Sequence, residues 1–139
     1  MAITARFYPS AVAKMFNNDI NTGDTFKMAL LDTDGTYAST DTLYSDVSGD
    51  EIAATGNYST GGATISPTIS AASDSTKTSF TIGSAAWTSA TIIFRYAVIY
   101  SSTSGALLMH LEWDSLQEAV AQDYTVNAPS PLPSATPVV

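Results

Sequence analysis

The chain has 139 residues, enough for one domain with a real hydrophobic core, and it carries a formal net charge of −8. Only 13% of the residues are charged, about half the usual ~25% of globular proteins, and 18 Ser, 19 Thr, 8 Gly and 6 Pro indicate a turn-rich β protein. Five Lys and Arg residues cannot form the basic stripe that phosphate recognition needs, so nucleic acid is excluded as a direct partner and anionic membrane surfaces are disfavoured.

The N-terminal part contains the one helix that the sequence predicts, over residues 10–17. Ser10 can cap it, and Val12, Met15 and Phe16 form an apolar stripe at helical spacing. Two turns do not stand alone in water, so we expect this helix to dock on another surface. The chain start lacks the uninterrupted apolar stretch of a signal peptide, and no segment approaches the ~20 apolar residues of a membrane span. We therefore expect a protein made in the cytoplasm.

Short strands dominate the sequence after this helix. The shorter predicted strands or extended segments cover residues 25–31, 43–47, 63–66, 79–82 and 124–127. A turn cluster at 32–36 and a glycine-punctuated loop at 56–62 separate them. Because proline cannot donate to a sheet ladder, Pro67 favours an edge position or a strand end for the segment that precedes it.

The clearest strand covers residues 91–100. It leads through a loop at 101–105 into a second strand over 106–113, which is the pattern of a β-hairpin. Both faces of the first strand are apolar, so we expect it to lie centrally, with a second layer on one side and a helix or a subunit on the other. On the face expected to point outward, Ile93 and Ile99 are candidate interaction residues.

Residues 128–139 are predicted to form an arm separate from the domain over residues 1–127, because they contain four of the six prolines. Such a segment can neither propagate a helix nor pair along its length in a sheet, and it favours the polyproline II conformation. Fixed φ angles lower the entropy lost on docking, so we expect the arm to make the intermolecular contacts that order it. Its candidate contact residues are Pro129, Pro131, Leu132, Pro133, Pro137, Val138 and Val139.

Few residues offer catalytic chemistry, and the chain has no cysteine. His110 is the only histidine, and without a Gly-x-Ser-x-Gly motif a surface histidine on a half-wet strand is favoured over a Ser-His-Asp system. Glu112 and Asp114 share one strand face, as the carboxylates of a hydrolase would, but solvation explains them better in so acidic a chain. The turn at Asp32 lacks the later ligands of a calcium loop. We expect no catalytic centre, no cofactor and no metal.

Aromatic side chains are a further candidate feature, since they could line a sugar-binding groove. They alternate with aliphatic residues along the predicted strands, so a place in the core or at a subunit interface is favoured. The residues concerned are Trp87, Phe94, Tyr96, Tyr100 and Trp113.

Several segments follow one another in a distinctive order between residues 10 and 127. They are a short helix, the strand at 26–31 with its turn, an acidic stretch before Gly56-x-Tyr58-x-x-Gly61-Gly62, Trp87 ahead of the 95–100 segment, and a Gly-containing loop into an apolar strand. This set resembles a family of small structural proteins encoded by tailed double-stranded DNA bacteriophages. The resemblance implies a non-enzymatic virion component, either a head decoration (cement) protein or a part of the neck or tail.

The sequence therefore predicts an all-β fold, a sandwich of two mainly antiparallel sheets with one N-terminal helix and an extended C-terminal arm. The expected function is to decorate the outside of a phage head, with the major capsid protein or other virion proteins as partners. We also expect a homo-oligomer, with a trimer favoured because trimers suit the local three-fold positions of an icosahedral shell. The alternatives are a neck, tail or tail-fibre module that binds a glycan or receptor, and a small hydrolase built on His110 or on Glu112 and Asp114.

Overall fold

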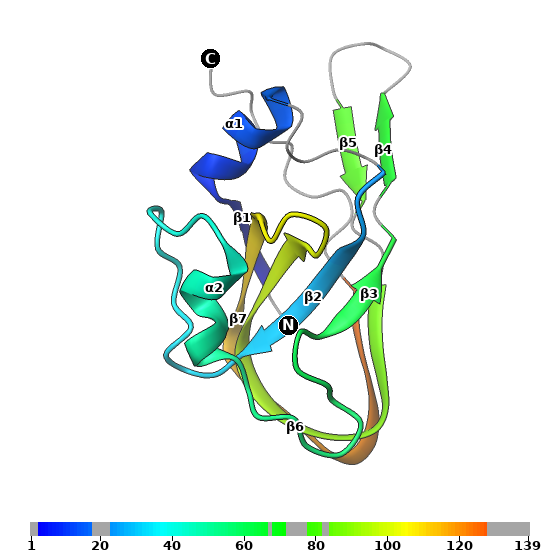
Figure 1. The fold of residues 1–139 in the computed structure, drawn as a ribbon. Coiled ribbons are helices and arrows are strands. Elements are labelled where there is room, and N and C mark those ends of the chain that lie inside the picture. Colours follow the sequence, from blue (N-terminus) through cyan, green and yellow to red (C-terminus); the bar gives the residue numbers. More distant parts are fainter. Residues whose placement is uncertain (1–2, 18–22, 67, 72–77, 82–83, 128–139) are drawn as a thin grey trace.

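The computed structural model describes residues 3–17, 23–66, 68–71, 78–81 and 84–127. The strands are β1 (Ile3–Phe7), β2 (Phe26–Leu31), β3 (Ala63–Ile65), β4 (Thr68–Ala71), β5 (Thr78–Thr81), β6 (Ser84–Ser101) and β7 (Leu107–Asn127). The helices are α1 (Pro9–Phe16), α2 (Tyr44–Val47) and the 3-10 turn η1 (Ser48–Asp50). An antiparallel five-stranded sheet has the order β1-β7-β6-β2-β3, and β4 pairs with β5 as a separate hairpin (Figure 1). The prediction of a mostly β, antiparallel protein is confirmed.

The long hairpin of β6 and β7 forms the middle of the sheet, as predicted from residues 91–113. β6 lies between β7 and β2, which confirms its central place. Both strands are much longer than expected, because β6 begins at Ser84 and β7 runs to Asn127. Residues 124–127 are therefore the end of β7 rather than a separate strand.

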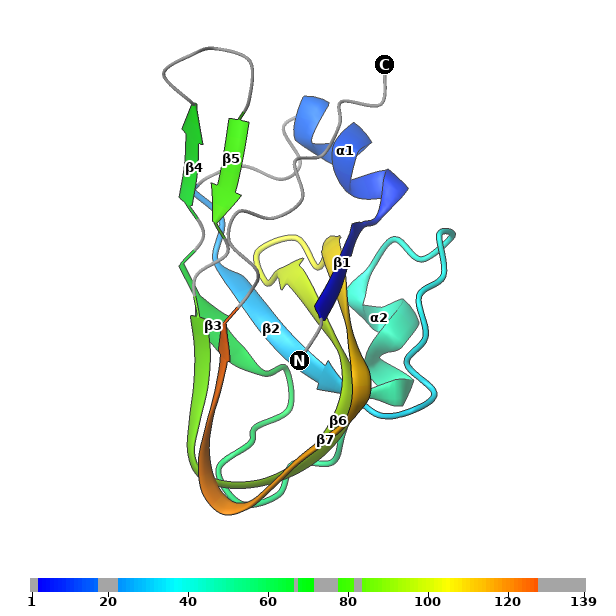
Figure 2. The same cartoon turned by 180° about the vertical axis from the view of Figure 1, so that it is seen from behind.

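Irregular pairing bends this hairpin strongly, as Figures 1 and 2 show. Between the pairs Phe94–Gln117 and Tyr96–Glu112, β6 advances two residues while β7 advances five. Two further bulges contain Ser89 and Ala121, whose φ angles of 47° and 50° lie in the left-handed region. Bulges increase local twist and bend a strand, so the distal part of the hairpin curls away from the plane of the other strands.

Aromatic residues fill the inside of the bend. The Phe94 ring stands edge-on to Trp113 with centroids 5.0 Å apart, and edge-on to Tyr124 at 5.3 Å. The interpretation of the strand aromatics as core residues is confirmed, because all five are buried in the described structure: Trp87, Phe94, Tyr96, Tyr100 and Trp113.

The expected exposure of Ile99 is wrong, whereas that of Ile93 is right. Ile99 is fully buried, and so are its neighbours across the sheet, Met28 of β2 and Met109 of β7. Ile93 lies farther out along β6, beyond the residues that pair with β2, and about half of its surface is exposed. A partner molecule can reach only Ile93 of the two.

The helix α1 begins one residue before the predicted cap, and it contacts β7 through a different face from the one expected. Val12 and Phe16 are exposed, Phe16 to 87%, and the fully buried residue is Ala11. The Ser10 hydroxyl has no hydrogen-bond partner in the described structure, so it does not cap the helix. The side chain of Met15 lies outside the described structure.

Of residues 43–47, all expected to be extended, Leu43 is extended and bridges Ala106, whereas Tyr44–Val47 form the helix α2. The Asp46 carboxylate accepts hydrogen bonds from the main-chain N–H groups of Thr42 and Leu43, both at 3.0 Å, and so satisfies donors before the first turn. These two bonds lower the pKa of Asp46, against a smaller opposing effect of burial. The sequence pattern gave no helical period over so short a segment.

Other local predictions are confirmed only where the structure describes the residues concerned. In the 32–36 turn, the Asp32 carboxylate accepts a hydrogen bond from the Asp34 N–H at 2.8 Å. β3 lies at an edge of the sheet and β5 covers most of the 79–82 segment, while Pro67 and Ile82 lie outside the described residues. The arm over residues 128–139, with all seven of its candidate contacts, also lies outside them. No described helix is long and apolar enough to span a membrane.

Candidate functional site

Three aliphatic side chains form an exposed cluster on the distal part of the β6–β7 hairpin, here called the outer patch. Ile93 is 49% exposed, Leu116 50% and Val120 57%. Ile93 lies directly opposite Glu118 in the register, so Leu116 and Val120 are its diagonal neighbours on the same face. The patch thus consists of Ile93, Leu116 and Val120 around the exposed carboxylate of Glu118.

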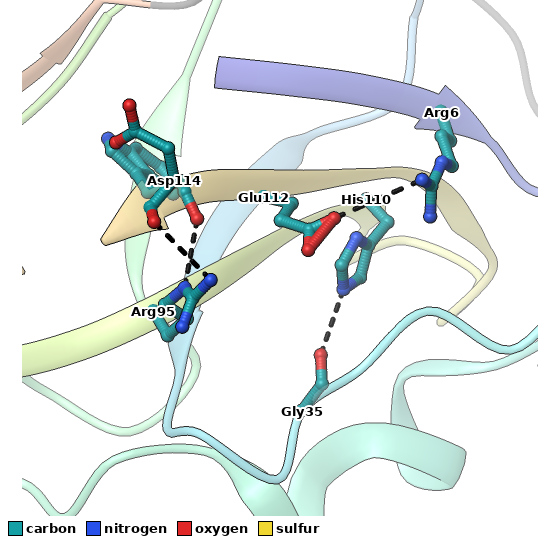
Figure 3. A network of polar contacts seen from close by, with 7 residues as sticks. Arg6, Gly35, Arg95, His110, Glu112 and Asp114 are labelled. Atoms are coloured by element: carbon teal, nitrogen blue, oxygen red, sulfur yellow. Dashed lines mark hydrogen bonds and ion pairs between the residues drawn. The ribbon is translucent and has the colours of Figure 1, made fainter. Parts of the chain in front are cut away.

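The bulge beside the patch is held by Arg95. Its Nε donates a hydrogen bond to the main-chain oxygen of Trp113 at 2.9 Å, and a terminal nitrogen reaches that of Asp114 at 3.5 Å (Figure 3). The guanidinium thus connects β6 to two main-chain carbonyl groups beside the irregular pairing of β7. Because a planar guanidinium has several donors in fixed directions, it sets the shape of the bulge that presents Leu116.

A buried amide supports the patch from the inside. Gln117 is almost fully buried, and its Nε2 donates to the main-chain oxygen of Ser115 at 3.0 Å. Its Oε1 accepts a hydrogen bond from the Tyr124 hydroxyl at 3.1 Å, which joins two parts of β7 across the bend. The backbone that carries the patch is therefore held by these side-chain hydrogen bonds.

His110 is not the surface residue that the sequence suggested. It is 1% exposed and lies against the rings of Tyr8, Tyr37 and Tyr96. Its Nε2 is 2.8 Å from the main-chain oxygen of Gly35 (Figure 3). A carbonyl oxygen can only accept, so Nε2 carries a proton. The residue fastens the 32–36 turn to β7.

The two carboxylates of the hydrolase hypothesis lie in different environments. Glu112 is half-buried and pairs with Arg6 at 3.9 Å, whereas Asp114 is exposed (Figure 3). Within the described ranges, no three His, Asp or Glu side chains are grouped so as to hold a metal ion.

Hydrogen bonds to a single carboxylate, that of Glu51, hold the glycine-rich loop. The sequence did not reveal this network. Glu51 accepts hydrogen bonds from the hydroxyls of Tyr44 and Tyr58, the latter at 2.7 Å, and from the N–H of Gly61 at 2.7 Å. The Tyr58 hydroxyl also accepts from the Leu30 N–H at 2.9 Å. Burial, and then the hydrogen bond to Glu51, raise the pKa of both tyrosines. Only the tyrosine within the Gly56–Gly62 motif hinted at this network.

The burial of His110 leads to a pH-dependent stability. Burial lowers its pKa from the usual 6.5, against smaller opposing effects from Gly35, Glu112 and Asp41. At pH values between 6.5 and the lower folded-state pKa, the unfolded chain binds more protons at His110 than the folded chain does. The free energy of unfolding therefore decreases as pH falls below about 6.5. We expect His110→Gln, which keeps a donor for the Gly35 oxygen, to flatten the dependence between about pH 5.5 and 7.5. Urea unfolding of both proteins measures this, and equal slopes would contradict it.

Sequence reasoning found Ile93 but missed the three β7 residues beside it, since it placed no strand between residues 114 and 123. Their signal was the alternation of Leu116, Glu118 and Val120, which the preceding bulge separates from the register of the first part of β7. Comparison of the chain with protein-family models, with curated proteins and with solved structures gave no match.

Proposed function

We propose that this chain is a non-enzymatic structural protein of a tailed bacteriophage particle, most specifically a decoration protein on the outside of the head. The observation that carries the proposal is the outer patch, where three aliphatic side chains of the described β6–β7 hairpin are exposed. Exposed apolar clusters mark interaction sites. The net charge of −8 suits a protein that faces away from packaged DNA.

The proposal includes self-association, with a trimer favoured, and contacts made by the Pro-rich arm over residues 128–139. One premise for the oligomer is weaker than expected, since Ile99 is buried and only Ile93 is available. The two-sheet sandwich also belongs to the proposal, with the curled distal hairpin as the start of a second layer.

An image of the particle tests the location. Cryo-electron microscopy of the phage that encodes this chain is expected to show many copies spread over the head. A ring of about six or twelve copies would place the protein at the neck or tail instead. Absence of the protein from purified particles would contradict any virion role.

A substitution tests the surface. We expect Ile93→Asp to weaken attachment to heads at least ~10-fold, because it removes an aliphatic side chain from the contact and adds a second carboxylate that must be desolvated beside Glu118. Ala86→Asp is the control, since it adds the same charge at an exposed position of the same strand. Sedimentation of labelled protein with heads measures both, and equal binding of the two variants would contradict the role of the patch.

A further inference from the structure

We propose that the outer patch docks a partner protein whose matching surface is apolar and carries a lysine or arginine at its centre. This inference rests on the proposed function, because it specifies the kind of partner that the same surface binds. Glu118 is the residue on which it depends. Glu118 lies opposite Ile93 and between Leu116 and Val120 along the same face of β7.

A molecule that covers the three aliphatic side chains must also remove Glu118 from water. In the part of the chain that the structure describes, Glu118 has no ion pair. Removing an unpaired carboxylate from water costs far more free energy than the burial of a few methyl groups supplies. The contact becomes favourable only when the partner brings a cation to that point. Charged side chains are depleted at the centres of interfaces, so one at this place is informative about the partner.

The described residues of a second copy are a poor source of that cation, and Lys77, the fifth Lys or Arg, lies outside them. Of the four described cations, Arg6 pairs with Glu112, Arg95 serves the bulge carbonyls and Lys14 donates to a main-chain oxygen, while Lys27 is half-buried. A two-fold contact centred on the patch would also set one Glu118 against the other, between molecules that each carry a net charge of −8. Charge complementarity therefore favours a different protein with a basic residue.

The patch is preorganised for such a contact. The hydrogen bonds of Arg95 and Gln117 fix the bulged backbone before any partner arrives, so little conformational entropy is lost on docking. Three half-exposed side chains cover much less than the ~800 Å² that each partner buries in a standard interface. The patch is thus the centre of a larger contact, in which Glu118 selects the partner.

Defined peptides test this inference without any phage material. In ¹⁵N NMR titrations, acetyl-Leu-Lys-Leu-amide is expected to shift the amides of residues 93, 116, 118 and 120 at least ~3-fold more than acetyl-Leu-Glu-Leu-amide or acetyl-Gly-Lys-Gly-amide does. Glu118→Gln is expected to remove the preference for lysine. Equal shifts with the glycine peptide, or shifts confined to other acidic positions, would overturn the inference.

Binding to heads that lack the protein tests it in the setting of the proposed function. Glu118→Lys is expected to weaken binding at least ~10-fold, whereas Thr125→Lys, which adds the same charge at an exposed site of β7, is not. If the wild type binds and Glu118→Lys binds equally, the inference fails and the proposed function stands. If the wild type binds no particle, the proposed function fails and the peptides still decide the inference. Loss of self-association in Glu118→Lys, measured by light scattering, would identify a second copy as the occupant and overturn it.

Discussion

Replacing Phe94 with alanine is expected to lower the free energy of unfolding by about 3–5 kcal/mol, the range found for large aromatic truncations in protein cores. Phe94 is fully buried, and its ring contacts Trp113 and Tyr124 edge-on. These two residues come from opposite sides of the bend in β7. The truncation therefore leaves a cavity at the point where the two parts of the curled hairpin meet. Urea denaturation followed by circular dichroism measures the loss.

Phe94→Leu is the matched variant, because it keeps most of the apolar volume and removes only the ring contacts. We expect it to lose less than half as much stability as the alanine variant. A loss below about 1 kcal/mol for Phe94→Ala would contradict the view that the bend is held by packing beneath it.

Replacing Gly62 with alanine is expected to cost about 2–5 kcal/mol through two effects that add. The φ angle of Gly62 is +82°, a left-handed conformation that costs an L residue about 1–2 kcal/mol. In addition, a Cβ atom would overlap the main-chain oxygen of Met28 and lie 2.8 Å from the Cα of Ala29. Relief of that overlap requires β2 and the loop to separate, which costs about 1–3 kcal/mol more.

Two other glycines separate these effects. Gly105 has a φ of +79° with open space around it, so Gly105→Ala is expected to cost only the conformational part, about 1–2 kcal/mol. Gly49 has neither feature, and Gly49→Ala is expected to change stability by less than about 0.5 kcal/mol. Thermal unfolding of the three variants measures the order. A loss at Gly62 no larger than that at Gly105 would show that the overlap with β2 is relieved without cost.

The central hairpin could be predicted from sequence because its signal is local. Apolar alternation over residues 91–100, a short loop and a second alternating segment specify two neighbouring strands. The continuation of β7 could not be predicted, since the bulge after Trp113 breaks the register. Beyond it the polar Gln117 is buried while the apolar Leu116 is exposed, the reverse of what residue type suggests. The position of a bulge depends on how the strand pairs with its partner. The sequence of one strand alone does not show that pairing.

The candidate site was predictable to a similar degree. The outward direction of Ile93 followed from alternation, but the burial of Ile99 depends on cross-strand neighbours that are far away in sequence. His110 was correctly placed on the same face as Glu112. Its burial comes from the Gly35 turn, which lies 75 residues earlier and covers that face of the sheet. Contacts at such separation leave no trace in local periodicity.

The position of β1 links completion of the sheet to synthesis of β7. Of the described strands, β1 is synthesised before the others, yet it pairs only with β7, from Ile3 opposite Trp113 to Phe7 opposite Met109. At ~5–20 residues per second, its partner emerges from the ribosome roughly 5–20 seconds later. Until then Ile3 and Phe7 have no sheet to join, whereas β6 and β7 can close at once over their short loop. The first of the described strands to be made is therefore the last to join the sheet, and the nascent chain leaves Ile3 and Phe7 uncovered until β7 emerges.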